Sequence, residues 1–281
     1  MTRKKSKPRA AVQIELGDCE EQLAALPSGS ADLILCDPPY NIGYRYRSHR
    51  DDMPAQDYLA WCERWLRLCI RALAPQGTLW LLNGDEFVSE LDVLAKQLGL
   101  VQRAHVVWLY GFGVACTRNF SRSHTHLLYY VKHRKLFTFN QDAVRVPSAR
   151  QLKYGDKRAN PDGKLPDRSW VLLKEDIEPL ANGSTDSWEV SRVCGTFHER
   201  AECSTNQLPE KLVERIVLAT SLPGDLVLDP MCGSGTTAVV AHRCGRRFLG
   251  FDKDAVCVAG ARQRVAAALA VERETGRGDE D

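Results

Sequence analysis

The apolar positions of the chain alternate between short runs and longer amphipathic stretches. Residues 32–36 form an apolar run typical of a strand buried on both faces, and residues 78–82 form another. Between them, residues 54–74 carry apolar side chains at three- and four-residue spacing, which predicts a helix closed by residues 75–77. Residues 86–99 predict a further helix that ends at a glycine.

The C-terminal part of the chain repeats this alternation. In order, it predicts a helix opened by Pro209, a strand at 226–228, a helix at 236–244, a strand at 247–251 and a last helix from about 255. Alternating strands and helices favour a mostly parallel central sheet with helices on both faces. We therefore expect an α/β fold.

A long stretch between these two blocks lacks clear periodicity. Residues 140–191 contain many proline and glycine breakers, and a structureless stretch of this length is unusual in a compact domain unless it is functional. We expect an irregular insertion that contacts a partner. The expected division is a basic tail at 1–12, one half of the α/β domain at 13–139, the insertion at 140–200, the second half at 201–271 and a polar tail at 272–281.

Composition and cysteine spacing limit the function classes. The chain is 44% apolar and has a net charge of +2, as in ordinary globular proteins, and no apolar run approaches the roughly 20 residues that span a bilayer. We expect a cytoplasmic protein without a membrane partner. Ten cysteines are scattered with no CxxC pair, so burial as small apolar residues is favoured and no metal site is expected.

Charge is concentrated in one segment. Residues 101–160 contain eleven Lys or Arg and two acids, a net charge of +9, so the rest of the chain carries −7. Aromatic residues are interleaved with these cations, a pattern that favours nucleic-acid binding. The candidate DNA contacts are Arg118, Arg122, Arg145, Arg150, Lys153, Lys157 and Arg158.

The first candidate chemical motif is Asp37-Pro38-Pro39-Tyr40, directly after the strand at 32–36. Ligands of open α/β sheets bind at such strand ends. A carboxylate and a backbone carbonyl can accept both N–H bonds of a base's exocyclic amine, which leaves its lone pair aimed at an electrophilic methyl group. The aromatic ring can stack on a flipped base. The alternative is a purely structural turn, in which the buried Asp37 side chain caps the backbone of the loop.

The second motif is the glycine-rich loop at residues 230–235, between the strand ending at Asp229 and the next helix. Glycines let the backbone approach a ligand closely, but the lysine of a nucleotide-triphosphate loop is absent. Asp252 ends the following strand, where an acid can accept ribose hydroxyls. The alternative is a tight turn with a surface aspartate.

Together these motifs resemble the DNA amino-methyltransferases of the permuted group, in which the catalytic motif precedes the cofactor motif. Residues 16–19, 32–43 and 223–237 carry the resemblance, which extends over residues 14–265. It implies a Rossmann-like S-adenosylmethionine-dependent methyltransferase fold. It also implies methyl transfer to N6 of adenine in double-stranded DNA after base flipping, because Asp is typical of the adenine enzymes at the first motif position.

The resemblance also assigns roles to residues. Catalytic roles fall to Asp37, Pro38, Pro39 and Tyr40. Cofactor contacts fall to Asp18, Cys19, Asp37, Asp229, Pro230, Cys232, Gly233, Ser234, Gly235, Thr236, Asp252 and Lys253. The insertion becomes the target-recognition region. A homodimer and a separate restriction endonuclease are the other partners that the resemblance suggests.

Three other functions stay open. They are a cytosine-N4 DNA methyltransferase, an RNA or protein-amide methyltransferase, and a DNA-binding module without activity. Two departures from the family pattern are also present. Relatives often have a His-Pro-Thr-Gln-Lys-Pro segment where residues 203–209 lie here without the lysine, and often have Glu where this chain has His126.

Overall fold

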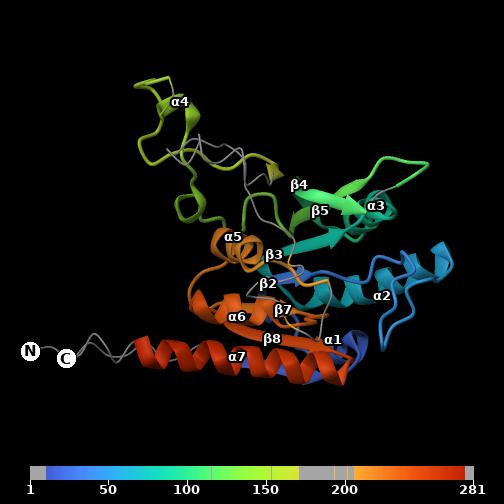
Figure 1. The fold of residues 1–281 in the computed structure, drawn as a ribbon. Helices are drawn as coiled ribbons and strands as arrows, with labels where there is room; N and C mark the ends of the chain where they lie inside the picture. Colours follow the sequence, from blue (N-terminus) through green and yellow to red (C-terminus); the bar gives the residue numbers. More distant parts are fainter. Residues whose placement is uncertain are drawn as a thin grey trace, which may run out of the picture.

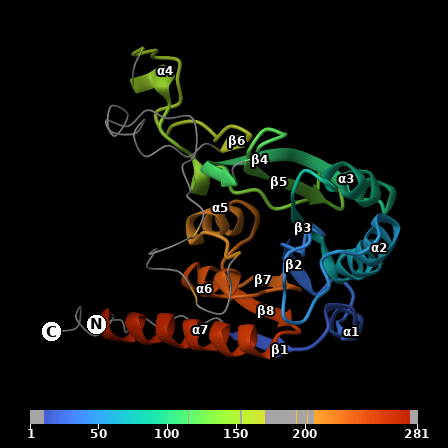
Figure 2. The ribbon, with the colours of Figure 1, turned by 45° about the vertical axis from the view of Figure 1, so that its right-hand side comes forward.

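One eight-stranded sheet organises the chain in the computed structural model, which describes residues 11–114, 116–152, 154–170, 193, 201 and 206–275. The strands are β1 Val12–Leu16, β2 Ala31–Cys36, β3 Leu73–Asn83, β4 Val101–Val114, β5 Arg122–Val131, β6 Ser169–Trp170, β7 Leu226–Asp229 and β8 Arg247–Asp252. Their order is β1-β8-β7-β2-β3-β5-β4-β6 (Figures 1 and 2). The first five are parallel neighbours, and β5 runs antiparallel to β3 and β4.

Helices cover both faces of the sheet, as predicted (Figure 2). One layer consists of α1 Cys19–Ala25, α2 Ala55–Ala72 and α3 Val88–Gln97, and the other of α5 Glu210–Thr220, α6 Thr236–Arg243 and α7 Ala255–Thr275. Because strand side chains alternate between faces, β2 contributes to two cores. Leu33 and Leu35 pack on the α5–α7 side, whereas Ile34 and Cys36 pack on the α1–α3 side.

Most predicted elements are confirmed, with differences at their ends. Residues 75–77 do not simply close a helix, because they lie within β3, which begins directly after α2. The register of β2 and β3 shifts between Ala31 and Leu33, and this irregularity accommodates Pro75. At the chain ends, β1 starts at Val12 and α7 continues to Thr275.

The main element that the sequence pattern did not predict is the long antiparallel pair β4–β5. Its ladder runs from Val101 opposite Val131 to Val114 opposite Arg122. The pair lies inside the basic segment, whose charges and polar residues obscure the alternation of buried side chains such as Val106 and Trp108. The sheet is therefore mostly parallel, with an antiparallel extension at one end.

The described part of the insertion is irregular and projects beyond the β4–β6 edge (Figures 1 and 2). It contains the short helices η1 Asp142–Val144 and α4 Ala149–Leu152. Asn140 anchors its start, since its side chain donates to the carbonyls of Leu218 (2.9 Å) and Ser221 (2.7 Å) at the end of α5. Residues 171–192 and 194–200 lie outside the described residues. In the described part of the chain, no helix is long and apolar enough to span a membrane.

Candidate functional site

The two predicted motifs meet in one cavity of about 1050 Å³ at the carboxyl ends of the parallel strands. Asp37 follows β2, and Asp229 ends the adjacent strand β7. Asp252 ends β8, the next strand along. Sheet order therefore brings together residues that are far apart in the sequence, and all three aspartates line the cavity.

The Asp37–Tyr40 loop is fixed by hydrogen bonds as well as by its prolines. The Tyr40 hydroxyl donates to Asp37 Oδ1 at 2.7 Å. On the other side of the loop, the hydroxyl of buried Tyr58 donates to the Pro39 carbonyl at 2.9 Å, and Asn83 Nδ2 donates to that hydroxyl at 3.1 Å. The loop is thus held between helix α2 and the end of strand β3.

The segment that follows is tied down by a second aspartate. Buried Asp51 accepts the backbone N–H groups of Asn41 (2.7 Å), Ile42 (3.1 Å) and Tyr44 (2.8 Å). The Asn41 amide exchanges two hydrogen bonds with the backbone of Met53. Asn41 has a φ of 58°, a conformation that asparagine tolerates better than most residues. These contacts preorganise the loop beside Tyr40.

Burial shifts the acidity of the first motif's carboxyl. It raises the pKa of Asp37 to about 6, although the hydrogen bond from Tyr40 works against the rise. Near neutral pH the side chain is therefore mainly a carboxylate, which can accept hydrogen bonds. Among the described residues, Tyr40 is the hydrogen-bond donor to this carboxylate.

The glycine-rich loop takes the shape that its sequence predicts. Gly233 and Gly235 have φ values of 46° and 76°, in the left-handed region that glycine adopts without strain. A Cβ on Gly235 would also lie 2.7 Å from the Cβ of Ala261. Asp252 holds the loop by accepting the Gly233 N–H through Oδ2 at 2.9 Å. Helix α6 begins immediately after the loop, at Thr236.

Asp229 is the most buried of the three aspartates at these strand ends, at 4% exposed. Thr237 donates to its Oδ2 at 2.6 Å, and the Met231 N–H donates to its Oδ1 at 3.1 Å. Burial nevertheless raises its pKa to about 7, with a further contribution from the negative charges of Asp37 and Asp252. A cationic ligand in the cavity would favour the carboxylate form.

The remaining predicted cofactor residues also surround this cavity, with one exception. Asp18 caps α1 by accepting the Glu20 N–H at 2.8 Å, and Lys253 Nζ lies 3.3 Å from His49 Nδ1. Cys19, Pro230, Cys232, Ser234 and Thr236 line the wall. Gly235 does not line it and acts through the turn instead. Cys19 and Cys232 are buried, as cysteine spacing predicted.

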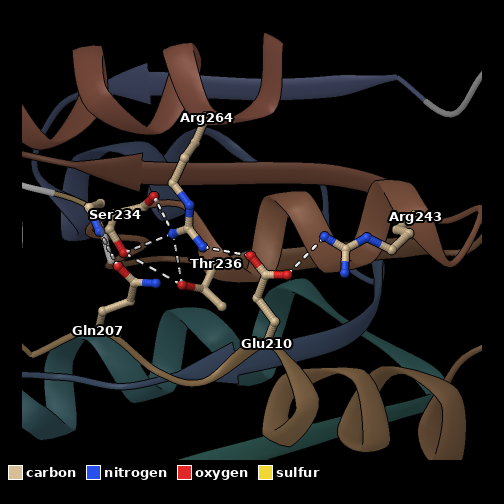
Figure 3. A network of polar contacts seen from close by, with 7 residues as sticks. Gln207, Glu210, Ser234, Thr236, Arg243 and Arg264 are labelled. Atoms are coloured by element: carbon tan, nitrogen blue, oxygen red, sulfur yellow. Dashed lines mark hydrogen bonds and ion pairs between the residues drawn. The ribbon is translucent and has the colours of Figure 1, made fainter. Parts of the chain in front are cut away.

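An arginine that sequence reasoning missed braces the glycine loop from outside the cavity (Figure 3). Arg264 on α7 donates to the Ser234 carbonyl and to Thr236 Oγ1, both at 3.1 Å. Its other nitrogen pairs with Glu210 of α5 at 2.8 Å, and Glu210 also pairs with Arg243 of α6. The network links three helices to the loop. Its only sequence signal is an arginine on the last helix.

Aromatic side chains were also missed as cavity residues. Tyr44, Tyr46, Trp61, Trp108, Tyr110 and Phe120 line the cavity beside Tyr40. Phe120 is 93% exposed on the β4–β5 connection. Such rings suit the stacking of a planar base, and their clustering depends on loops and strands that come together only in the fold.

The predicted DNA contacts occupy two places. Arg118 and Arg122 belong to the β4–β5 pair and its connection, where Arg122 forms an ion pair with Glu86 and lines the cavity. The others are on the projecting insertion. Arg150 and Arg158 both pair with Asp156 and hold its pKa well below the usual range. Arg145 pairs with Asp142, Lys157 is exposed, and Lys153 lies outside the described residues.

Comparison with known proteins identifies the family. Residues 31–263 match the family model of the N6/N4 methyltransferases, described as DNA methylase. The chain belongs to this family. The methylase is 34% identical over 244 residues to the type II methyltransferase M.HpaI of Haemophilus parainfluenzae, a match that covers 86% of this chain and 70% of M.HpaI. It is 33% identical over 239 residues to the DNA adenine methyltransferase YhdJ of Escherichia coli (strain K12), a match that covers 84% of this chain and 76% of YhdJ.

Solved structures confirm the predicted fold. TTHA0409 of Thermus thermophilus, solved in complex with S-adenosyl-L-methionine, aligns with a TM-score of 0.60 at 23% identity, covering 92% of this methylase and 94% of that chain. S-adenosyl-L-methionine is the ligand of that solved structure, and DNA is the substrate of the family. The cavity fits this cofactor. Buried carboxylates and the backbone of the glycine loop line a space that can hold a nucleoside bearing a positively charged sulfonium. The expected homodimer, endonuclease partner and cytoplasmic location stay predictions.

Proposed function

We propose that this methylase transfers a methyl group to N6 of adenine in double-stranded DNA, and that it acts on a base flipped into the cavity. The observation that carries the proposal is the fixed Asp37–Tyr40 pair at the cavity wall. The aspartate at the first motif position and the adenine activity in the name of YhdJ both favour adenine over cytosine.

The Asp37 loop supplies two acceptors for the target amine. Tyr40 donates to Oδ1 of Asp37, so Oδ2 is the carboxylate oxygen assigned to one amine N–H. The Pro38 carbonyl takes the second N–H, since the neighbouring Pro39 carbonyl already accepts from Tyr58. Two such bonds orient the nitrogen lone pair, and positioning of this kind accounts for much of the rate enhancement of a transfer.

The Tyr40 ring holds the flipped base. Tyr40 lies against Gly84 at the end of β3, where a Cβ would be 3.3 Å from the Tyr40 ring. Any larger residue at position 84 would therefore press on the ring. Stacking on one aromatic ring contributes about 1–3 kcal/mol per base, which helps to offset the cost of unstacking.

Other residues of the same cavity are assigned to the cofactor. S-adenosylmethionine, when bound, supplies an electrophilic methyl group on a sulfonium. We assign its methionine part to Asp229 and the loop of Gly233 and Gly235, and its ribose to Asp252. Asp18 and Cys19 are assigned to its adenine. The basic residues of the β4–β5 connection and of the insertion are assigned to the DNA backbone and target sequence.

The test is to incubate purified methylase with unmethylated DNA and S-adenosylmethionine, digest the DNA to nucleosides and identify the product by mass spectrometry. N6-methyladenine is the expected product, and it should disappear with Asp37→Ala. N4-methylcytosine would overturn the adenine assignment and keep the site. The absence of any modified nucleoside on several DNAs, with cofactor binding intact, would overturn the choice of substrate.

A further inference from the structure

Three side chains beside the cavity converge on one point. His124 and His126 are two residues apart on β5, so both project from the same face of the strand. Asn83 of β3 pairs with His126, which brings the following loop residue Asp85 next to both histidines. Nε2 of His124 is 2.8 Å and Nε2 of His126 is 3.0 Å from the same Asp85 Oδ1.

These three atoms have the chemistry and spacing of a metal site. Their ligand atoms lie within 4.8 Å of one another. Two imidazole nitrogens and one carboxylate oxygen form a donor set that suits zinc and neighbouring divalent transition metals. With bonds of about 2.0–2.1 Å, two ligands of a tetrahedral Zn²⁺ are roughly 3.3 Å apart. The two contacts to Asp85 are slightly shorter than this separation, so a small outward movement of the Asp85 carboxylate would make room for the ion.

A further histidine orients one ligand. His105 Nε2 lies 2.9 Å from Nδ1 of His126, and their rings meet edge to face at 4.9 Å. A histidine that binds a metal through Nε2 carries its proton on Nδ1, and this proton usually needs an acceptor. His105 on the neighbouring strand β4 offers that acceptor. Such a partner fixes the ring and the tautomer of His126 for binding through Nε2.

The site opens toward the cavity. Asp85 and His124 line it together with Asp37, and the side chains of Asp85 and His124 are 41% and 30% exposed. Three protein ligands leave a coordination position for water in such a partly exposed place. Cysteine spacing gave no hint of this cluster, because sheet pairing rather than sequence proximity joins its members.

We propose that Asp85, His124 and His126 bind one divalent transition-metal ion of the zinc class at the rim of the methyl-transfer cavity. The rival explanation is a hydrogen-bonded cluster in which both imidazoles donate to Asp85 without a metal. In that cluster His105 would donate to His126, so metal binding reverses the direction of the His105–His126 hydrogen bond. The proposal holds whichever base is methylated.

The test uses the full-length protein, purified without a histidine tag, stripped of metal and titrated with Co²⁺. We expect saturable binding of one equivalent with the visible d–d bands of a four-coordinate ion, and displacement by Zn²⁺. The His124→Ala/His126→Ala double variant should bind at least 10-fold less, and Asp85→Asn should weaken binding. His133→Ala, an exposed histidine just beyond β5, and Cys116→Ser, an exposed cysteine of the same cavity, should bind like the wild type.

Two results would overturn the proposal. One is the absence of stoichiometric binding to the wild-type protein. The other is binding that persists unchanged in the double histidine variant, which would place the ion elsewhere. Thermal unfolding of each variant establishes that it is folded, so a loss of binding cannot be mistaken for a loss of structure.

Discussion

The hydroxyl of Tyr40 donates a hydrogen bond of 2.7 Å to Oδ1 of Asp37, three residues earlier in the same loop. The residue proposed to stack on the base and the residue proposed to accept the amine are therefore directly coupled. The proposal gives the ring and the hydroxyl of Tyr40 separate tasks, since the ring is assigned to the base and the hydroxyl lowers the pKa of the Asp37 carboxyl.

Two substitutions of Tyr40 should separate these tasks. Tyr40→Ala removes the stacking surface, and we expect DNA methylation to slow by about 10- to 100-fold, in line with the free energy of one base–aromatic stack. Tyr40→Phe keeps the ring and should retain most activity at pH 8, where Asp37 is ionised in both proteins. Single-turnover rates at saturating cofactor measure the difference. Equal losses in the two variants would exclude the stacking role.

The pH dependence should report the Asp37 carboxyl. Its ionised form is the stronger acceptor of an N–H bond, and its pKa is about 6, so activity should rise with pH through about 6. Tyr40→Phe removes the hydrogen bond that lowers this pKa, and the rise should move to higher pH. The measurement is kcat/KM for DNA from pH 5 to 8.5 at saturating cofactor. A rise at the same pH in both proteins would argue against the coupling.

Asp37→Asn should abolish turnover and yet stabilise the cofactor-free protein at pH 8. The pKa of Asp37 is raised from 3.8 to about 6. Its stabilising contribution is thus complete below 3.8 and is lost as pH rises through about 6. At pH 8 the buried carboxylate costs on the order of 3 kcal/mol, which corresponds to a Tm gain of several degrees for the variant. Differential scanning calorimetry should show this gain shrinking toward pH 5.

Asp254→Asn provides a control in which the expected change of stability at pH 8 has the opposite sign. Burial pushes the pKa of Asp254 upward, but Arg47 and the backbone N–H groups of Val256 and Cys257 outweigh it and hold the pKa below its usual value. Its contribution is present above the unfolded pKa and is lost as pH falls through the folded one. The Asp254 variant should therefore be less stable than wild type at pH 8. A destabilised Asp37→Asn protein at that pH would contradict the burial argument.

Arg264→Ala should weaken cofactor binding although Arg264 does not line the cavity. Its hydrogen bonds to Ser234 and Thr236 hold the glycine loop, and its loss also leaves Glu210 without one of its two arginines. We expect about a 10-fold rise in the Kd for S-adenosylmethionine, measured by calorimetry. Arg262→Ala on the same helix removes two hydrogen bonds to the Ile14 carbonyl instead and should change the Kd less than twofold. Similar increases of the Kd in both variants would show that the loss of affinity comes from a general disturbance of helix α7 and not from the glycine loop.

The sequence allowed a site residue to be predicted where its position depends on residues close to it in the chain. Asp37 and Gly235 could be located because prolines and glycines mark strand ends, and strand ends of a parallel sheet share one edge. Arg264 could not be found in this way, since its contact with Ser234 depends on how α7 packs. The β4–β5 pair was missed because its charged and polar positions conceal its alternation. Which distant segments of the chain contact one another is decided by tertiary packing, and the local periodicity of the sequence does not contain that information.

The pairing of β2 with β7 has a consequence for synthesis of the protein. Leu33 and Ile34 of β2 pair with Val227 and Leu228 of β7. The part of the cavity next to the Asp37 loop therefore forms only after almost two hundred further residues have been made. A chain still emerging from the ribosome carries the Asp37 loop without the glycine loop. Such non-local pairings close slowly, because the chain entropy is lost before the contacts form. The cavity wall beside the Asp37 loop therefore forms only after β7 has been made and has paired with β2.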